Sequence, residues 1–156
     1  MLNSVPTVSN GKPAYYSYSY LDPNTQAPQS WPFNPAGVYA MLTESALKYY
    51  QYSGNRAAVT VAESVAAWHL AHGMTPATAA WANVPYSEGD AGSLTYQGAA
   101  YGNTNGIGDG TGYLEPDKIG ELGYAWLTLY QFDGNTAFRE AAITCADVLA
   151  AKIRTG

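Results

Sequence analysis

The sequence predicts an all-α fold made of two stacked helical hairpins. Apolar residues recur at three- and four-residue spacing in four segments, a Gly-Asn pair divides the segments of each hairpin, and a long Gly-rich stretch divides the hairpins. Two helices alone cannot bury their apolar faces, so the two hairpins are expected to stack. The length of 156 residues is that of one domain.

Residues 1–34 are predicted to form an irregular N-terminal arm, and residues 35–156 the helical-hairpin domain. Five prolines fall in the arm among many Ser, Asn and Tyr residues. Proline disfavours helix interiors and central strands, so the arm is expected to lie outside the core. Tyrosines alternate with Ser17 and Ser19, and a short extended stretch would place on one face Tyr16, Tyr18 and Tyr20.

The first hairpin is predicted from a helix over residues 35–52 and a second over residues 56–72. The inner stripe of the first is expected at Val38, Met41, Leu42, Ser45/Ala46 and Tyr49. Between the helices, Gly54 suits the left-handed conformation that ends a helix, and Asn55 suits the cap of the next one. The inner stripe of the second is expected at Val59, Ala62, Ala66, His69 and Leu70.

The second hairpin repeats this pattern with an offset of 80 residues. Its first helix is expected from about Glu115 to Gln131, because acidic residues and a proline suit a first helical turn, and its inner stripe comprises Ile119, Leu122, Trp126 and Leu129. Gly134-Asn135 then takes the place of Gly54-Asn55. The last helix is expected from Thr136 to Ile153 through Phe138, Ala141/Ala142, Cys145, Val148/Leu149 and Lys152.

A long loop over residues 73–114 connects the hairpins. It carries nine glycines and shows no sustained periodicity, and a loop of this length in a compact domain is usually functional or disordered. Interleaved aromatic residues give it area to pack, which favours order. Because tight turns alternate with long connections, the long loops are expected on one face of the stack, where function usually lies.

The composition limits the classes of partner. Charged residues make up only 12% of the chain and the formal net charge is −5, so the chain lacks the clustered Lys and Arg that nucleic-acid binding needs. No apolar run is long enough to cross a bilayer, so no membrane partner is expected. The N-terminus lacks the pattern of a signal peptide, and a secreted or periplasmic location would require an export signal already removed. Cys145 is expected to be buried and unreactive.

Two paired turns and the long aromatic loop give the chain a resemblance to a known family. The turns are Tyr50-Gln51-Tyr52-Ser53-Gly54-Asn55 and Tyr130-Gln131-Phe132-Asp133-Gly134-Asn135. Over residues 35–153 it resembles the six-hairpin (α/α) toroid superfamily of glycoside hydrolases, polysaccharide lyases and sugar epimerases. The resemblance implies a groove in which loop aromatics stack on sugars and acids near helix starts carry the chemistry. Two hairpins would be a partial toroid, so either more hairpins lie beyond the chain ends or several chains assemble as a homo-oligomer.

Carboxylates at both ends of the long loop are the candidate catalytic groups. Asp90 and Glu115 are the first choices, with Glu88 and Asp117 beside them. Hydrolysis of a glycosidic bond uses two carboxyl groups, about 5–5.5 Å apart for retention or about 6.5–9.5 Å apart for inversion. The alternative is structural: Glu115 and Asp117 favour the positive end of a helix, and Asp90 stabilises a glycine turn.

Four aromatic residues are candidates for stacking on a polysaccharide, because a flat apolar ring with a polar rim suits a pyranose face: Trp31, Trp81, Tyr86 and Tyr101. Ordinary packing of the loop is the alternative for each. Lys118 is a further candidate for contact with substrate. His69 is another, either as a core or groove residue or as the base of a lyase-type elimination with Tyr86 or Tyr101 as the acid.

No cofactor is expected. Asn103, Asn105 and Asp109 offer oxygen ligands for calcium, but their spacing does not fit the twelve-residue calcium loop of a helix-loop-helix site. His69 and His72 share a helix face without a third ligand nearby, which argues against a transition metal. The competing class of function is a non-enzymatic, self-assembling structural protein whose Tyr-rich arm makes contacts between chains.

Overall fold

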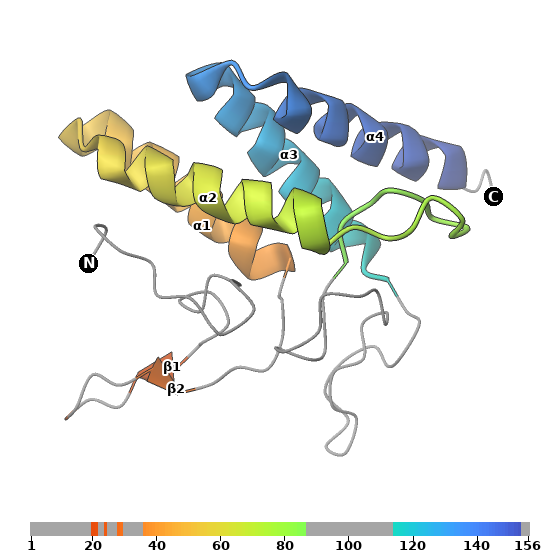
Figure 1. The fold of residues 1–156 in the computed structure, drawn as a ribbon, viewed down its shortest axis with the longest axis horizontal. Helices are drawn as coiled ribbons and strands as arrows, with labels where there is room; N and C mark the ends of the chain where they lie inside the picture. The colour runs from red at the N-terminus through yellow and green to blue at the C-terminus, as the bar shows by residue number, and fades with distance from the viewer. Residues whose placement is uncertain (1–19, 22–23, 25–27, 30–35, 87–113, 154–156) are drawn as a thin grey trace.

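The computed structural model describes residues 20–21, 24, 28–29, 36–86 and 114–153 (Figure 1). Four helices dominate this part of the chain: α1 (Ala36–Ser53), α2 (Arg56–His72), α3 (Pro116–Asp133) and α4 (Thr136–Lys152). Two strands of two residues each, β1 (Tyr20–Leu21) and β2 (Pro28–Gln29), precede them. The described helical region confirms the all-α prediction, and the four helices lie where the four apolar segments predicted them.

The two strands pair in antiparallel fashion within the N-terminal arm. Tyr20 lies opposite Gln29, and Leu21 lies opposite Pro28. Tyr20 is thus part of an extended segment, as the alternation of tyrosine and serine predicts. Tyr16 and Tyr18 lie outside the described residues.

The two inner turns have the same backbone geometry. Gly54 and Gly134 have φ values of 68° and 71°, in the left-handed region that favours glycine. The backbone N–H of each donates to the carbonyl oxygen four residues earlier, Tyr50 and Tyr130 respectively, at 2.8 Å in both turns. These bonds satisfy carbonyls that the helix end would otherwise leave unpaired, which ends α1 and α3.

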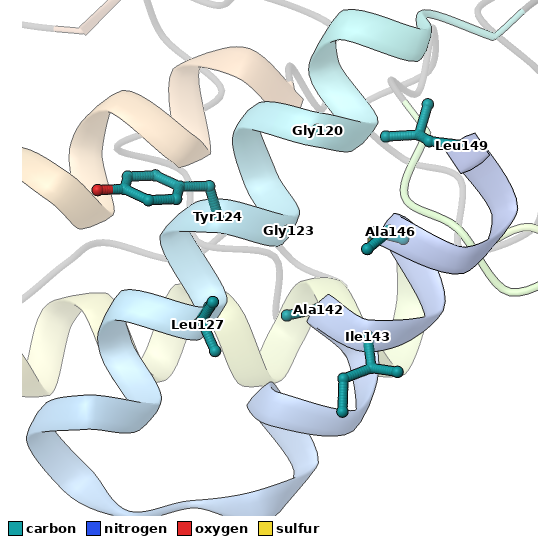
Figure 2. A pocket seen from close by; sticks show the side chains of 9 residues that line it. Gly120, Gly123, Tyr124, Leu127, Ala142, Ile143, Ala146 and Leu149 are labelled. Carbon is teal, nitrogen blue, oxygen red and sulfur yellow. The ribbon is translucent and has the colours of Figure 1, made fainter. Parts of the chain in front are cut away.

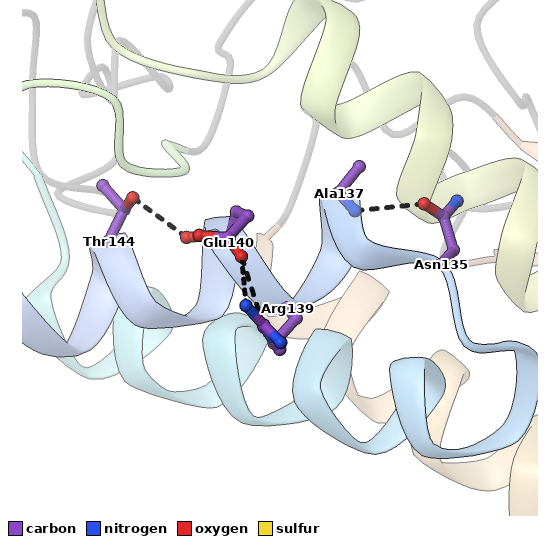
Figure 3. Close-up of polar contacts among 5 residues, drawn as sticks. All are labelled: Asn135, Ala137, Arg139, Glu140 and Thr144. Atoms are coloured by element: carbon purple, nitrogen blue, oxygen red, sulfur yellow. Dashed lines mark hydrogen bonds and ion pairs between the residues drawn. The ribbon is translucent and has the colours of Figure 1, made fainter.

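The residue after each glycine begins the next helix. The Asn55 side chain accepts a hydrogen bond from the Ala57 N–H at 3.0 Å, and the Asn135 side chain accepts one from the Ala137 N–H at 3.1 Å (Figure 3). An asparagine N-cap contributes about 1 kcal/mol to a helix. Residues that correspond in the 80-residue repeat therefore make the same hydrogen bonds in the two turns.

The helices form two hairpins, α1–α2 and α3–α4, that pack through α1 and α3. α1 contacts both α2 and α3, whereas α2 and α3 touch each other little. Figure 1 shows both inner turns at one end of the stack and the connection from α2 toward α3 at the other. We call these the turn end and the loop end. The start of α3 and the ends of α2 and α4 lie at the loop end.

An aromatic cluster joins three helices in the core. Tyr39 of α1 meets His69 of α2 edge to face, with ring centroids 5.5 Å apart, and His69 lies 5.9 Å from the Trp126 ring of α3. All three side chains are buried. Aromatic pairs of this geometry add about 0.5–1.5 kcal/mol each beyond their area, so the cluster fixes the second hairpin on the first.

The predicted inner stripe of α1 is confirmed in part, since Ala46 is buried and Leu42 is half-buried. Val38, Met41 and Tyr49 are exposed, and the buried face of α1 comprises Ala36, Gly37, Tyr39, Ala40, Thr43, Ala46 and Leu47. Apolar residues occur around most of this helix, so spacing alone offers two candidate faces. Contact with two neighbouring helices selects the face rich in small residues, because small side chains let the helix axes approach closely.

The other predicted stripes agree better with the structure. All four stripe residues of α3 are buried, as are Val59, Ala62, Ala66 and His69 of α2, while Leu70 is half-buried. In α4, Phe138, Ala142 and Cys145 are buried, but Lys152 is exposed. Within the described residues, no helix is both long and apolar enough to cross a membrane.

Candidate functional site

The loop end is organised by a compact turn over residues 73–86. Thr75 is buried at its centre, where its hydroxyl donates to the Trp81 carbonyl at 2.6 Å and accepts from the Val84 N–H at 3.0 Å. Its backbone N–H donates to the Val84 carbonyl, and its carbonyl accepts from the Asn83 N–H. Asn83 has a φ of 55°, a left-handed conformation that asparagine tolerates. One buried threonine thus holds both sides of the turn.

Tyr86 closes this turn against α2. Its N–H donates to the Gly73 carbonyl at 3.0 Å, and its hydroxyl donates to the His72 carbonyl at 3.2 Å. The Tyr86 side chain is only 2% exposed. In this arrangement the Tyr86 ring covers the end of α2 and has no open face on which a sugar could stack.

Trp81 links the turn to the end of α4. The ring is half-buried, and the Lys152 ammonium lies 5.7 Å from its centroid. A cation at this distance is attracted to the aromatic face by about 0.5–1 kcal/mol at an exposed position. The contact holds Trp81 at the loop end while part of its surface stays accessible.

Charged side chains gather at the start of α3. Glu115 is the N-cap residue of α3, and its carbonyl accepts from the Ile119 N–H at 3.1 Å. The Lys118 ammonium lies 3.2 Å from a carboxylate oxygen of Asp117 and 3.4 Å from one of Glu121. Asp117, Lys118 and Glu121 therefore form one charged group at the loop end, close in sequence to Glu115.

Lys118 also fixes this charged group relative to α1. A methyl group at Gly37 would come within 2.7 Å of the Lys118 Cδ, so only a glycine lets the lysine stem lie across α1 without displacement. Lysine buries its methylene stem in this way while its ammonium stays near water. The position of Lys118 thus depends on a specific residue of the first hairpin.

The ion pairs act on the pKa values of both partners. Burial alone would raise the pKa of Asp117, but the hydrogen bond and positive charge of Lys118 together lower it below its ordinary value. Burial would lower the pKa of Lys118, and Asp117 and Glu121 together raise it. The lowered pKa favours the carboxylate form of Asp117, which accepts hydrogen bonds and does not donate a proton at neutral pH.

His69 lies in the core and not at a surface. It is fully buried between Tyr39 and Trp126, and a methyl group at Gly73 would come within 2.6 Å of its ring. These contacts are those of a packed core residue. The burial places the imidazole away from any surface that a polymer could reach in this conformation.

The remaining predicted site residues lie outside the described residues: Trp31, Glu88, Asp90 and Tyr101, as well as the calcium candidates Asn103, Asn105 and Asp109. Trp81 lies in the turn after α2, and Glu115, Asp117 and Lys118 lie at the start of α3, so all four belong to the loop end, whereas His69 and Tyr86 are buried. Within the part of the chain that the structure describes, no three His, Cys, Asp or Glu side chains are placed to hold a metal ion.

An apolar groove that the sequence pattern did not predict lies between α3 and α4 (Figure 2). We call it the α3–α4 groove; its volume is about 290 Å³, and its lining includes Gly120, Gly123, Tyr124, Leu127, Ile143 and Leu149. The sequence signal was present, because Gly120 and Gly123 share a face of α3 at three-residue spacing, and glycines there leave room beside the next helix.

A smaller hollow lies between the two hairpins, along α1 and α3. Its volume is about 200 Å³, and its lining mixes charged and apolar side chains: Glu44, Leu47, Lys48, Gln51, Tyr124, Thr128 and Phe132. Tyr124 lines both this hollow and the α3–α4 groove. One exposed tyrosine therefore joins the interface between the hairpins to the open surface beyond it.

No protein family, curated protein or solved structure matches the chain. Support for a function therefore comes from the geometry of the loop end and of the α3–α4 groove.

Proposed function

We propose that this chain is a carbohydrate-active protein that binds a polysaccharide at the loop end. The observation that supports the proposal is that Trp81, in the turn after α2, and the charged residues at the start of α3 lie at the same end of the helical stack. A partly accessible indole can stack on a sugar ring, while carboxylate and ammonium groups bind the hydroxyls at its rim. The low charge and many tyrosines of the chain suit a neutral polymer.

The proposal includes hydrolysis of the bound polymer. Asp117 is the candidate base, and Glu115, two residues earlier in the chain, is the candidate proton donor. Glu88 and Asp90 are the further candidates from the other end of the long loop. With two carboxyl groups on opposite sides of the glycosidic bond, the acid would give its proton to the leaving oxygen while the base takes a proton from the water that attacks the anomeric carbon.

Binding is tested by titrating the chain with a panel of soluble neutral and acidic polysaccharides and following tryptophan fluorescence and calorimetric heat. Trp81→Ala is expected to weaken the dissociation constant about 10-fold, the effect of losing one aromatic contact of about 1.4 kcal/mol. Tyr130→Ala is the matched control, because Tyr130 is also half-buried beneath a cation, Arg139, but it lies on α3 near the inner turn. Equal effects of both variants, or no binding to any polysaccharide, would contradict the proposal.

Catalysis is tested separately by measuring new reducing ends with any polysaccharide that binds. Glu115→Gln and Asp117→Asn are expected to lower the rate at least about 100-fold, as loss of a positioned acid or base does. Retained binding by these variants would assign the loss to the chemical step. Binding by the unaltered chain without any cleavage would limit the protein to a binding function.

A further inference from the structure

Large exposed apolar side chains lie on two surfaces of the hairpin stack, one between α3 and α4 and one on α1. One is the α3–α4 groove with Tyr124, Leu127 and Ile143 exposed around it (Figure 2). The other is the exposed side of α1, where the spacings of three, eight and three residues place on one helix face Val38, Met41, Tyr49 and Tyr52. We call this second surface the α1 face.

The 80-residue repeat identifies what covers such a groove. The positions in the first hairpin that correspond to Leu127 and Leu149 are Leu47 and His69; both of these are buried, whereas Leu127 is exposed and Leu149 is half-buried. The second hairpin covers them, since α3 packs along α1 and the His69 ring lies 5.9 Å from the Trp126 ring of α3. The α3–α4 groove is therefore the surface on which a further hairpin of the same kind would pack.

The same repeat identifies the surface that would enter the groove. The positions on α3 that correspond to Val38, Met41, Tyr49 and Tyr52 are Lys118, Glu121, Leu129 and Phe132. On α3 this side faces the first hairpin: Lys118 lies across Gly37, and the Phe132 ring lies 5.9 Å from the Tyr50 ring. The α1 face thus corresponds to the side of α3 that makes the contact within the chain.

We infer that a second copy of this chain lays its α1 face in the α3–α4 groove, as α3 lies against the first hairpin within one chain. The groove is continuous with that internal interface, since Tyr124 lines both surfaces. The contact joins two different surfaces, so each bound copy leaves one of each open. Such a head-to-tail contact produces a closed ring or a growing filament and not a symmetric pair.

The first test measures the mass of the full chain by light scattering over a wide range of concentration. An oligomer, or a mass that rises with concentration, is expected. Ile143→Asp in the groove and Met41→Asp on the α1 face are each expected to weaken association at least about 10-fold, because each would bury an unpaired charge. Ala67→Asp is the control at an exposed position of α2 and should leave association unchanged.

Mixing the two variants distinguishes the head-to-tail contact from a symmetric one. The Ile143→Asp chain retains its α1 face and the Met41→Asp chain retains its groove, so a mixture should form a heterodimer and stop there. Circular dichroism of each variant checks that the helices remain. A monomeric mass at every concentration would overturn the inference. So would a dimer that resists either single substitution, or a mixture that stays monomeric.

Discussion

Leu47 and Leu127 occupy corresponding positions in the two hairpins, yet Leu47 is 2% exposed and Leu127 is 39% exposed. The leucines lie on the same side of their helices, and the turns that follow them have the same geometry. The difference arises from neighbours, because the second hairpin packs on the side of α1 that carries Leu47, while the corresponding side of α3 lines the open α3–α4 groove. The difference in exposure between two identical side chains at corresponding positions of the repeat thus shows which surface has no neighbouring helix.

This pair gives a direct prediction for stability. Leu47→Ala is expected to lower the free energy of unfolding by about 2–5 kcal/mol, because it opens a cavity in the core. Leu127→Ala is expected to lower it by less than about 1 kcal/mol, because a side chain near the surface loses little buried area. Urea denaturation at a concentration where the chain is monomeric measures both values. Equal losses would show that Leu127 is covered within the single chain.

Glycines on α3 give a second prediction, because they face α4 at different distances. A methyl group at Gly123 would lie 2.8 Å from the Cys145 Cβ, whereas one at Gly120 would lie 3.6 Å from its nearest neighbour, the Leu149 Cδ1. Gly123→Ala should destabilise the chain by about 1–3 kcal/mol through overpacking. Gly120→Ala should be neutral or stabilise it by up to about 1 kcal/mol through helix propensity. Thermal unfolding of both variants measures this difference in stability. If Gly120→Ala were the more destabilising variant, the close approach of α3 and α4 at Gly123 would be refuted.

The inner turns give a third prediction. No atom lies within 4 Å of a methyl group placed at Gly54 or Gly134, so a substitution there acts only through the left-handed backbone. Gly54→Ala and Gly134→Ala should each cost about 1–2 kcal/mol of unfolding free energy, and Gly54→Asn should cost less, because asparagine tolerates this conformation. Losses that add in the double variant would show two independent turns. A neutral Gly54→Ala would mean that the turn does not require a positive φ.

The turns and helices are the part of the fold that the sequence specifies locally. A glycine and a capping asparagine determine where one helix ends and the next begins, and both signals act within a few residues of chain. The predicted helices therefore match those of the structure to within about two residues. Which side of α1 is buried depends instead on packing against α3, so Val38 and Met41 were predicted inside and lie outside.

The candidate site was predictable to the same degree. Acidic residues and a proline at a helix start predict the position of Glu115 and Asp117, because both suit the first turn of a helix. The burial of His69 agrees with its predicted place in the inner stripe of α2, whereas the burial of Tyr86 was not predictable, since it depends on the turn held by Thr75. Glu88 and Asp90 stay predictions, because they lie outside the described residues.

Cys145 carries the last prediction, which concerns pH. Its side chain is buried against α3, and burial raises the pKa of the thiol to about 12. In the unfolded chain the thiol titrates near 8.5. The folded state therefore holds its proton more tightly, so the stabilisation is fully present below the unfolded pKa and is lost as the pH rises toward about 12.

Two measurements check this assignment. Above pH 9 the free energy of unfolding should fall by up to about 1.4 kcal/mol per pH unit because of this thiol, and Cys145→Ala, which has no titrating group, should show a shallower slope than the unaltered chain. A thiol reagent at pH 8 should modify the native chain far more slowly than the urea-unfolded chain, because thiolate is scarce and access requires opening of the α3–α4 contact. Rapid native modification together with an unchanged slope would place Cys145 at an accessible surface and contradict the packing of α4 on α3.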